Sequence, residues 1–388
     1  MKYIIIGNGA AGMGAAEAIR ARDTEGELTI YTDENRFHYS RPRIIEYLGG
    51  GIDASKLTIR GEDFYTKLNI RLMRDTPVES IDPVNHRIVL RDGGTDRFDR
   101  LVIASGASAF LPPVEGVGLD CVFTLRTIDD AERILAHEAG KGRVVVIGGG
   151  LLGLETAASL VKRGRKVTVV EVFDRLLPRQ LDVDAAAMLQ SSLEAMRMTF
   201  RLGKRTAAIR EAGTSAEVLF EDGSSISADI VVFSAGIKSN ASIAIEAGIA
   251  CERGILVDER METNFAGIFA AGDVAQFRGT VYGLWMASRE QGLVAGANAA
   301  GAAMTYPGSQ ISARLKVSGI ELVSLGSIET GEAVKVFTRR DGGSFKRLFA
   351  KDGRLVGAIL IGDVSAFPSL QKRIKSGEPI GDPESLLK

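Results

Sequence analysis

Two short segments of the chain have the glycine spacing that holds the pyrophosphate of a dinucleotide. The first reads Gly7-Asn8-Gly9-Ala10-Ala11-Gly12, and the second reads Gly148-Gly149-Gly150-Leu151-Leu152-Gly153. In such a loop the first glycine permits a tight turn, the second lets the backbone approach the pyrophosphate, and the third brings helix and strand together. The helix that follows offers unpaired N–H groups and a partial positive charge to the phosphates.

The elements around the two loops are also repeated. Each loop follows an apolar strand, opens a helix and precedes a second strand that ends near an acid, Asp33 in the first repeat and Glu171 in the second. Such an acid accepts hydrogen bonds from ribose hydroxyls. One glycine motif is weak evidence, but two copies in this context predict two βαβ units that bind dinucleotides. The expected strands are residues 3–6, 28–31, 144–147 and 167–170, with the second helix over residues 154–163.

Two dinucleotide sites in one chain indicate one tightly held redox cofactor and one exchangeable partner, for which FAD and a nicotinamide nucleotide are the natural pair. Residues 263–275 read TNFAGIFAAGDVA, a short strand followed by Gly272 and Asp273 and then by an Ala-rich stretch that we expect to be helical. An Asp at this place can accept a hydrogen bond from a sugar hydroxyl. Residues 100–107 and 231–237 read as buried strands that end in glycine turns, where the chain crosses between domains; these turns contain Ser105, Gly106 and Gly236.

The composition excludes several other classes of protein. With 48 basic and 49 acidic residues in 388, the chain lacks the basic excess of a nucleic-acid binder. Cys121 and Cys251 lie far apart, which excludes a disulfide framework and favours a reducing compartment. The apolar run over residues 144–161 contains four glycines and Glu155, so it predicts a strand, a turn and a helix, not a membrane span. The three histidines have no metal or triad spacing, and we expect a cytoplasmic protein.

Three further segments carry a family resemblance. They are Tyr39-Ser40-Arg41-Pro42, Thr124-Leu125-Arg126-Thr127 and Gly272-Asp273-Val274. With the two glycine loops, they resemble the FAD-dependent pyridine-nucleotide oxidoreductases over essentially the whole chain. Residues 315–319 (LKVSG) and 361–365 (IGDVS) are similar, more narrowly, to NADH:rubredoxin oxidoreductases and to related flavin subunits of multi-component oxidoreductases.

The resemblance implies roles for individual residues. The first loop would hold FAD, with Asp33 or Glu34 on the adenosine ribose, Asp273 on the ribityl chain and Trp285 near the isoalloxazine ring. The full set of expected FAD contacts is Gly7, Gly9, Ala10, Ala11, Gly12, Asp33, Glu34, Arg41, Val78 through its backbone, Ser105, Gly106, Arg126, Gly272, Asp273 and Trp285. The expected NADH contacts are Gly148, Gly150, Leu152, Gly153, Glu155 near the nicotinamide, Glu171 on the adenosine ribose, Arg179 and Gly236.

Two departures from the resembling proteins bear on the chemistry. Relatives that reduce disulfides or oxygen carry a redox cysteine near the position of Pro42, or a CxxC or CxxxxC motif, and this sequence has neither. We therefore expect no thiol relay. Relatives that serve oxygenases carry a Lys shortly after Arg-Pro, where this chain has Glu46. Glu46 either changes the redox tuning of the flavin, by removing a cation near it, or is an ordinary surface residue of a helix. His38, beside Arg41, either lies near the cofactor or has a structural role.

The expected fold is α/β, with two Rossmann-like dinucleotide-binding domains of the glutathione reductase type and a small α+β C-terminal domain. The FAD domain is expected over residues 1–110 and 236–306, the NAD domain over 111–235 and the C-terminal domain over 307–388.

The expected function is hydride transfer between NAD(H) and FAD, with one-electron exchange with an iron–sulfur protein or with an iron–sulfur subunit of a larger complex. One alternative is a non-catalytic flavin-binding redox sensor or scaffold. The other is a peripheral NADH:quinone reductase, which would need an amphipathic C-terminal helix with an apolar face, whereas residues 371–375 are mostly polar. The physiological acceptor, the direction of electron flow and the oligomeric state, homodimer or complex subunit, stay open.

Overall fold

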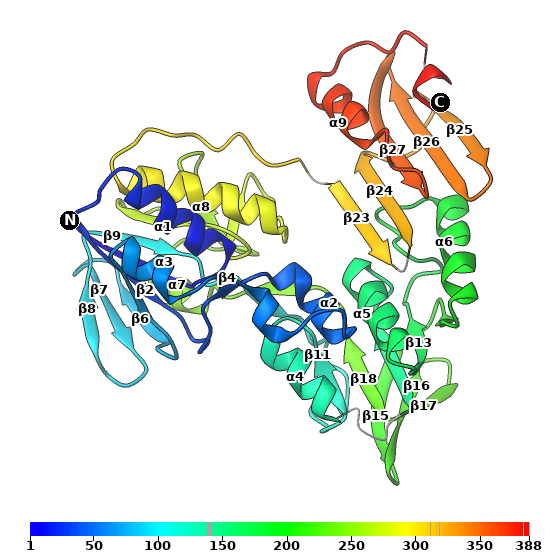
Figure 1. The fold of residues 1–388 in the computed structure, drawn as a ribbon, viewed down its shortest axis with the longest axis horizontal. Helices are drawn as coiled ribbons and strands as arrows, with labels where there is room; N and C mark the ends of the chain where they lie inside the picture. The colour runs from blue at the N-terminus through cyan, green and yellow to red at the C-terminus, as the bar shows by residue number, and fades with distance from the viewer. Residues whose placement is uncertain (138–141, 311, 318, 383, 388) are drawn as a thin grey trace. The chain divides into compact units, whose positions relative to one another are not determined.

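The computed structural model describes residues 1–137, 142–310, 312–317, 319–382 and 384–387. Ser318 of the LKVSG segment, and Ile311 and Lys388 of the expected C-terminal domain, lie outside the described residues. The chain forms two compact units (Figure 1). Unit 1 is Met1–Arg43, Asp53–Ala109 and Gly236–Ser309, and unit 2 is Ile44–Ile52, Phe110–Ala235 and Gln310–Lys388.

A parallel five-stranded sheet forms the centre of unit 1. Its strand order is β21-β9-β1-β2-β5. The first strand reads KYIII, a nearly continuous apolar run of the kind that parallel sheets bury on both faces, and Ile4 and Ile5 are fully buried. The strands are β1 (Lys2–Ile6), β2 (Glu27–Tyr31), β5 (Ile70–Met73), β9 (Arg100–Ile103) and β21 (Ile268–Ala270).

Helices α1 (Ala10–Arg20) and α8 (Trp285–Ala299) pack closely against each other in unit 1. Small residues permit the approach, because a Cβ on Gly292 would lie only 2.1 Å from the backbone oxygen of Ala11. The expectation of a helix directly after Asp273 is wrong. Strand β22 (Ala275–Phe277) pairs there with β20 (Ile255–Val257), and the helix begins only at Trp285.

The rest of unit 1 is made of short elements around this sheet. They are β3 (His38–Tyr39), β4 (Thr58–Arg60), β6 (Val78–Asp82), β7 (Arg87–Leu90), β8 (Thr95–Arg97), β10 (Ala107–Ala109), β19 (Ile237–Ser239), α3 (Glu62–Lys67), α7 (Ser242–Glu246), η1 (Arg41–Arg43) and η2 (Ala54–Leu57).

Unit 2 contains a second parallel sheet, in the order β11-β18-β12-β13-β14, beside an antiparallel sheet β15-β16-β17. Helix α5 begins at Leu151, earlier than residue 154, because the third glycine of the motif lies inside the first turn of the helix. The elements are β11 (Val122–Thr124), β12 (Arg143–Ile147), β13 (Lys166–Val170), β14 (Thr199–Arg201), β15 (Thr206–Ala212), β16 (Ser215–Phe220), β17 (Ser225–Ala228), β18 (Ile230–Phe233), α2 (Ile44–Leu48), α4 (Ile128–His137), α5 (Leu151–Lys162) and α6 (Val183–Ala195).

The C-terminal part of unit 2 is an antiparallel sheet in the order β23-β24-β27-β26-β25 with one helix, α9, against it (orange to red in Figure 1). Val323, Leu348 and Leu360 form its core with Leu370 of the helix. The predicted α/β class with two Rossmann-like parts and a small α+β part is confirmed. The elements are β23 (Ser312–Val317), β24 (Ile320–Gly326), β25 (Val334–Asp341), β26 (Ser344–Lys351), β27 (Arg354–Ile361), α9 (Phe367–Ser376) and η3 (Glu384–Leu387).

Candidate nucleotide-binding sites

The first glycine loop connects β1 to α1, and its three glycines are held by different constraints. Gly7 has φ 107°, and a Cβ there would lie 2.2 Å from the backbone oxygen of Ala104. A Cβ on Gly12 would lie 1.9 Å from the oxygen of Gly7. Gly9 has φ −80°, and a Cβ there would meet nothing within 4 Å. The chain therefore requires glycine at 7 and 12, whereas the middle position opens onto free space, as a pyrophosphate needs.

The second glycine loop, between β12 and α5, repeats this pattern. Gly148 has φ 124°, and its Cβ would lie 2.2 Å from the oxygen of Ser234. A Cβ on Gly153 would lie 2.0 Å from the oxygen of Gly148. At Gly150, with φ −77°, a Cβ would again meet nothing within 4 Å. Both loops thus fit a ligand whose phosphates lie against the backbone.

Hydrogen bonds align the strand ends of the two repeats. Gly7 N donates to Tyr31 O at 2.7 Å, and Gly148 N donates to Val170 O at 2.8 Å. The residue after Tyr31 is Thr32 and the residue after Val170 is Glu171, so these two are structurally equivalent. The first repeat is two residues longer up to this point, and its acids, Asp33 and Glu34, lie just beyond the strand end.

Glu171 is fixed beside the second loop. Its side chain is buried, Oε2 accepts a hydrogen bond from Gly149 N at 2.7 Å, and Oε1 accepts one from Phe173 N at 3.0 Å. A carboxylate has about four acceptor directions, so this one can still accept from a ribose. Leu152 and Glu155 lie on α5 directly after the loop, and Arg179 is exposed beyond Glu171.

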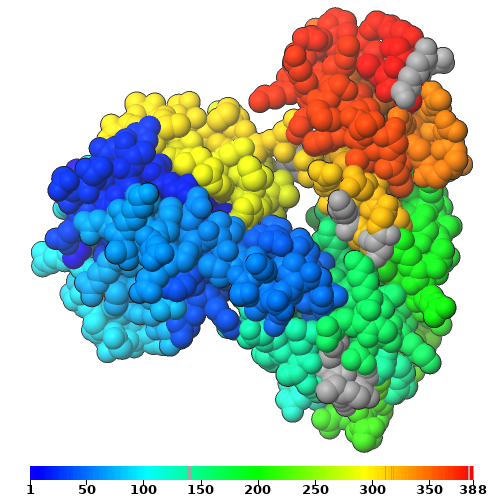
Figure 2. Space-filling view, viewed as in Figure 1, coloured from blue at the N-terminus to red at the C-terminus, as the bar shows by residue number. Residues whose placement is uncertain are grey.

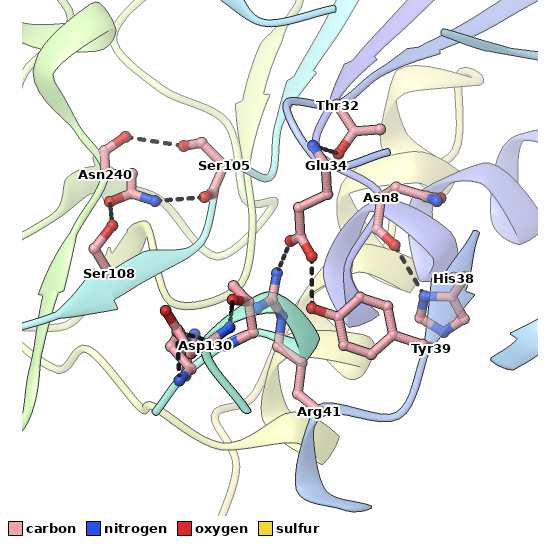
Figure 3. Close-up of polar contacts among 12 residues, drawn as sticks. Asn8, Thr32, Glu34, His38, Tyr39, Arg41, Ser105, Ser108, Asp130 and Asn240 are labelled. Carbon is pink, nitrogen blue, oxygen red and sulfur yellow. Dashed lines mark hydrogen bonds and ion pairs between the residues drawn. The ribbon is translucent and has the colours of Figure 1, made fainter. Parts of the chain in front are cut away.

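Glu34 is held inside unit 1 (Figure 3). The Tyr39 hydroxyl donates to Glu34 Oε2 at 2.6 Å, and the Arg41 guanidinium forms an ion pair with Glu34 Oε1. Burial acts to lower the pKa of Arg41, but Tyr39 and Glu34 outweigh it and hold that pKa above its usual value. Asp33 is exposed and lines a cavity of about 320 Å³ with Asp75, Thr76, Pro77, Leu90, Arg91 and Asp92. Val78 follows this cavity wall in the chain.

Asn8, the second residue of the first loop, is the centre of contacts that the sequence did not reveal. Its backbone oxygen accepts from His38 Nδ1 at 2.9 Å (Figure 3). Its Oδ1 accepts from the Tyr65 hydroxyl at 2.9 Å. Its buried Nδ2 has no hydrogen-bond partner within the part of the chain that the structure describes. An orphaned amide donor in a phosphate loop fits an anionic ligand.

His38 is buried and stacks on Trp285, with ring centroids 5.6 Å apart. Burial lowers the pKa of His38, so its ring is neutral near pH 7. The contact of Nδ1 with a backbone oxygen fixes the tautomer, because that oxygen only accepts. The two interpretations of His38 are a place near the cofactor and a structural role. The structure shows a hydrogen bond between His38 and Asn8 of the first loop, which is a structural contact.

Asp273 lies at the carboxyl end of β21, beside the same loop. It is 9% exposed, and Ser288 Oγ donates to its Oδ1 at 3.0 Å. The preceding Gly272 has φ 87°, and a Cβ there would lie 2.8 Å from Ala11 Cβ, which places Gly272 against the start of α1. Trp285 opens α8 after this strand.

Two predicted contacts, Gly236 for NADH and Arg126 for FAD, do not belong to the same unit as the glycine loop of their predicted site. Ser105 and Gly106 are joined to Asn240 by hydrogen bonds within unit 1, Ser105 Oγ donating to Asn240 O at 2.9 Å. Gly236, predicted for NADH, also belongs to unit 1. Arg126, predicted for FAD, belongs to unit 2, where its backbone N–H donates to the carboxylate of Asp130.

Comparison with known proteins decides the family. A model described as pyridine nucleotide-disulphide oxidoreductase matches residues 1–292, and one described as rubredoxin NAD+ reductase C-terminal domain matches residues 312–378. The chain belongs to the pyridine nucleotide-disulphide oxidoreductase family. The predicted resemblance, the enzyme class and the cofactor pair are confirmed, since members of this family are oxidoreductases that use FAD and NAD(H).

Individual relatives cover this oxidoreductase over nearly its whole length. It is 33% identical over 386 residues to the NADH-rubredoxin oxidoreductase of Clostridium acetobutylicum, covering 99% of this chain and 97% of that protein. The crystal structure of NADH:rubredoxin oxidoreductase from that organism matches with a TM-score of 0.85 at 31% identity, covering 100% of this chain and 98% of that one.

A second kind of relative is longer than this chain. The oxidoreductase is 36% identical over 387 residues to the nitrite reductase [NAD(P)H] of Bacillus subtilis, covering 97% of this chain and 48% of that protein. The chain therefore spans about half the length of the first curated relatives that it matches.

Neither metal nor membrane features are found in the residues that the structure describes. Among them, no cluster of three or more His, Cys, Asp or Glu side chains is arranged to hold a metal ion. No helix within the same ranges combines the length and apolar character needed to cross a bilayer.

Proposed function

We propose that unit 1 of this oxidoreductase binds FAD and that the βαβ part of unit 2 binds NADH. The observation that carries the proposal is the pair Gly9 and Gly150. Each has an ordinary extended backbone with empty space around a Cβ, between two glycines that the chain's own backbone requires. Neither the backbone conformation nor the neighbouring atoms of the chain require glycine at these two positions. Glycine at the same place in both loops therefore supports an external ligand that approaches the backbone.

For FAD, the contacts of unit 1 support specific roles. Asp33, on the 320 Å³ cavity, would accept from the adenosine ribose, and the backbone of Val78 would hold the adenine. Glu34 would hold Arg41 in place, and Arg41 would face the cofactor's phosphates. Asp273 would accept from the ribityl chain, with Trp285 near the isoalloxazine ring. We propose the remaining FAD contacts as the first loop, Ser105, Gly106, Arg126 and Gly272.

For NADH, we propose that Glu171 accepts from the adenosine ribose, with its orientation set by Gly149 N. Leu152 and Glu155 would contact the dinucleotide from α5, and Arg179 and Gly236 would complete the site. The corresponding domains would be residues 1–110 and 236–306 for FAD, 111–235 for NADH, and 307–388 as the C-terminal domain.

We propose a one-electron iron–sulfur protein as the electron acceptor. FAD, when bound, accepts a hydride and releases electrons singly. The similarity to NADH-rubredoxin oxidoreductase extends over 97% of that relative, and the C-terminal residues match the rubredoxin reductase model. Neither Cys121 nor Cys251 forms a disulfide, and two cysteines cannot hold a cluster, so the iron would belong to another protein or subunit. Cysteines outside any disulfide also support a reducing compartment such as the cytoplasm.

The test is an anaerobic stopped-flow experiment on the purified flavoprotein. NADH should reduce the flavin, and mixing the reduced protein with rubredoxin or a co-purifying iron–sulfur subunit should reoxidise it much faster than free FADH₂ reduces the same carrier. The proposal fails if every iron–sulfur protein reacts no faster than with free FADH₂ while a quinone or oxygen turns over rapidly. A long-lived reduced complex with every acceptor would favour a redox sensor instead.

A further inference from the structure

One arginine joins the C-terminal sheet of unit 2 to helix α6. On β26, Arg347 Nη1 lies 2.6 Å from Asp182 Oδ2 and Nη2 lies 2.8 Å from Asp184 Oδ2. Its Nε donates to Thr338 Oγ1 at 2.8 Å, and its side chain is only 15% exposed. Figure 2 shows orange atoms of the C-terminal sheet directly against green atoms of α6. Because all three guanidinium nitrogens are engaged, the side chain has one orientation.

Asp182 connects this arginine to the second nucleotide site. Its Oδ1 accepts from Ala185 N at 2.9 Å and caps the N-terminus of α6, while its Oδ2 accepts from Arg347. Asp182 is also the last residue of the segment that begins after Glu171. We call residues 172–182 the connecting segment. Arg347 therefore holds the far end of a segment whose near end is the proposed ribose acid.

The middle of the connecting segment lies against the second glycine loop. Leu177 N donates to Gly149 O at 3.2 Å, and the side chain of Leu176 comes within 3.0 Å of where a Cβ of Gly149 would be. Leu177 has φ 49°, a left-handed conformation that is strained for a non-glycine residue and persists only when its surroundings hold it. The contacts at the two ends of the segment add to the burial of Leu177 in holding this strained residue against the loop.

We propose that Arg347 is a positioning residue for the pyridine nucleotide, acting through Asp182 on the connecting segment and so on Gly149 and Glu171. This rests on the proposal that the second loop binds NADH. Without Arg347, the carboxylate of Asp182 loses the cation that joins it to the sheet, and the far end of the connecting segment keeps only its helix cap to Ala185 N. The loop then orders the dinucleotide less well. Hydride transfer from bound NADH is unchanged, because Arg347 acts only on binding.

Four variants of the FAD-loaded protein separate this role from general stability. Arg347→Gln removes the contact, and Arg347→Lys restores the charge without the two-pronged geometry. Asp182→Asn removes the charge but keeps the helix cap, since Asn caps as well as Asp. Arg340→Gln is the matched control, because Arg340 also pairs with Asp184, at 3.3 Å, but is 62% exposed.

Two measurements are made on each variant. The first is hydrogen–deuterium exchange of residues 172–182 without nucleotide. The second is the rate of flavin reduction at increasing NADH, which gives the NADH dissociation constant separately from the limiting rate. We expect Arg347→Gln and Asp182→Asn to speed exchange in the connecting segment and to weaken NADH binding about three- to thirtyfold at an unchanged limiting rate. Arg347→Lys should recover part of both effects, and Arg340→Gln should match the wild type.

The outcomes that overturn the proposal are distinct. Unchanged exchange in both Arg347→Gln and Asp182→Asn refutes the link to the connecting segment. Faster exchange with unchanged NADH affinity refutes the link to the nucleotide. If Arg347→Gln fails to fold, the same two outcomes are judged on Arg347→Lys and Asp182→Asn. A wild-type protein that NADH neither binds nor reduces refutes the proposed function, and the positioning role with it.

Discussion

The carboxylate of Glu171 accepts a hydrogen bond from the backbone N–H of Gly149 at 2.7 Å, and this contact holds the proposed ribose acid against the loop proposed to bind the pyrophosphate of NADH. A carboxylate at this place repels a 2′-phosphate, so we predict NADH to be preferred over NADPH. Glu171→Gln keeps the shape and an acceptor for Gly149 but loses the charge. The ratio of kcat/KM for NADPH to that for NADH should rise about tenfold, about 1.4 kcal/mol.

The control for Glu171 is Asp174→Asn, an acid in the same segment whose side chain is 81% exposed. It should leave the ratio nearly unchanged. Equal kcat/KM for the two nucleotides in the wild-type protein would refute the assignment of Glu171.

Substitutions of two glycines in the first loop should separate an effect on FAD binding from an effect on the stability of the fold. Gly9→Ala introduces a Cβ into empty space at an ordinary φ, so the melting temperature of the flavin-free protein should stay the same or rise slightly, while FAD occupancy falls more than tenfold. Gly12→Ala places a Cβ 1.9 Å from a backbone oxygen and should destabilise the fold itself. Melting curves and flavin content measure the two effects. A fully flavin-loaded Gly9→Ala protein would contradict the site.

Asp273 should be needed for FAD retention. Its buried carboxylate accepts from the Ser288 hydroxyl, and Asp273→Ala would leave that hydroxyl and the proposed ribityl hydroxyls without an acceptor. We expect the purified variant to lose FAD or to bind it poorly. Ser288→Ala, which removes one hydrogen bond worth about 1 kcal/mol, should keep most of the flavin. Full occupancy and activity in Asp273→Ala would end this assignment.

The glycines of the two loops could be predicted from the sequence, because the spacing within a short motif is enough to identify them. Gly7 and Gly12 are required by atoms only a few residues away or on the adjacent strand, and the motif carries that requirement in its spacing. The two strands end at Tyr31 and Val170, as predicted, but the acids that follow them are not at equivalent positions. Glu171 was matched with Asp33, whereas the hydrogen bonds match it with Thr32, because the first repeat has two more residues before its strand end.

Contacts between distant parts of the chain left no local signal. The His38 contact with Asn8 joins residues 30 apart, and the Arg347 contact with Asp182 joins residues 165 apart. Asn8 occupies a position that the motif leaves variable, so spacing alone could not single it out. The strand β22 after Asp273 was mistaken for helix because its Ala-rich surroundings favour helix locally, while pairing with β20 decides the structure.

Thiols should play no part in electron transfer. Cys121 and Cys251 form no disulfide and are partly buried, and burial raises the pKa of the Cys251 thiol, which keeps it from forming the reactive thiolate. The double variant Cys121→Ser, Cys251→Ser should therefore show unchanged NADH-dependent flavin reduction in a stopped-flow assay. Loss of reduction in a folded, flavin-loaded double variant would overturn this.

His38 should make the stability of unit 1 depend on pH. Burial lowers its pKa in the folded protein below the value near 6.5 of an unfolded histidine. Arg60 and Arg41 act in the same direction, and the Asn8 carbonyl and Glu17 oppose it.

Because the unfolded chain then binds more protons, the contribution of neutral His38 is complete above pH 6.5 and is lost as the pH falls below it, by at most about 1.4 kcal/mol per pH unit. His38→Gln, which keeps a donor for Asn8 O but does not titrate, should flatten the decline in unfolding free energy between pH 7 and 5. His86→Gln, at an exposed histidine, is the control and should keep the wild-type slope. Urea denaturation of the flavin-free proteins, followed by circular dichroism at each pH, measures the slopes. Identical slopes for wild type and His38→Gln would show that His38 is not held neutral by its burial against Trp285.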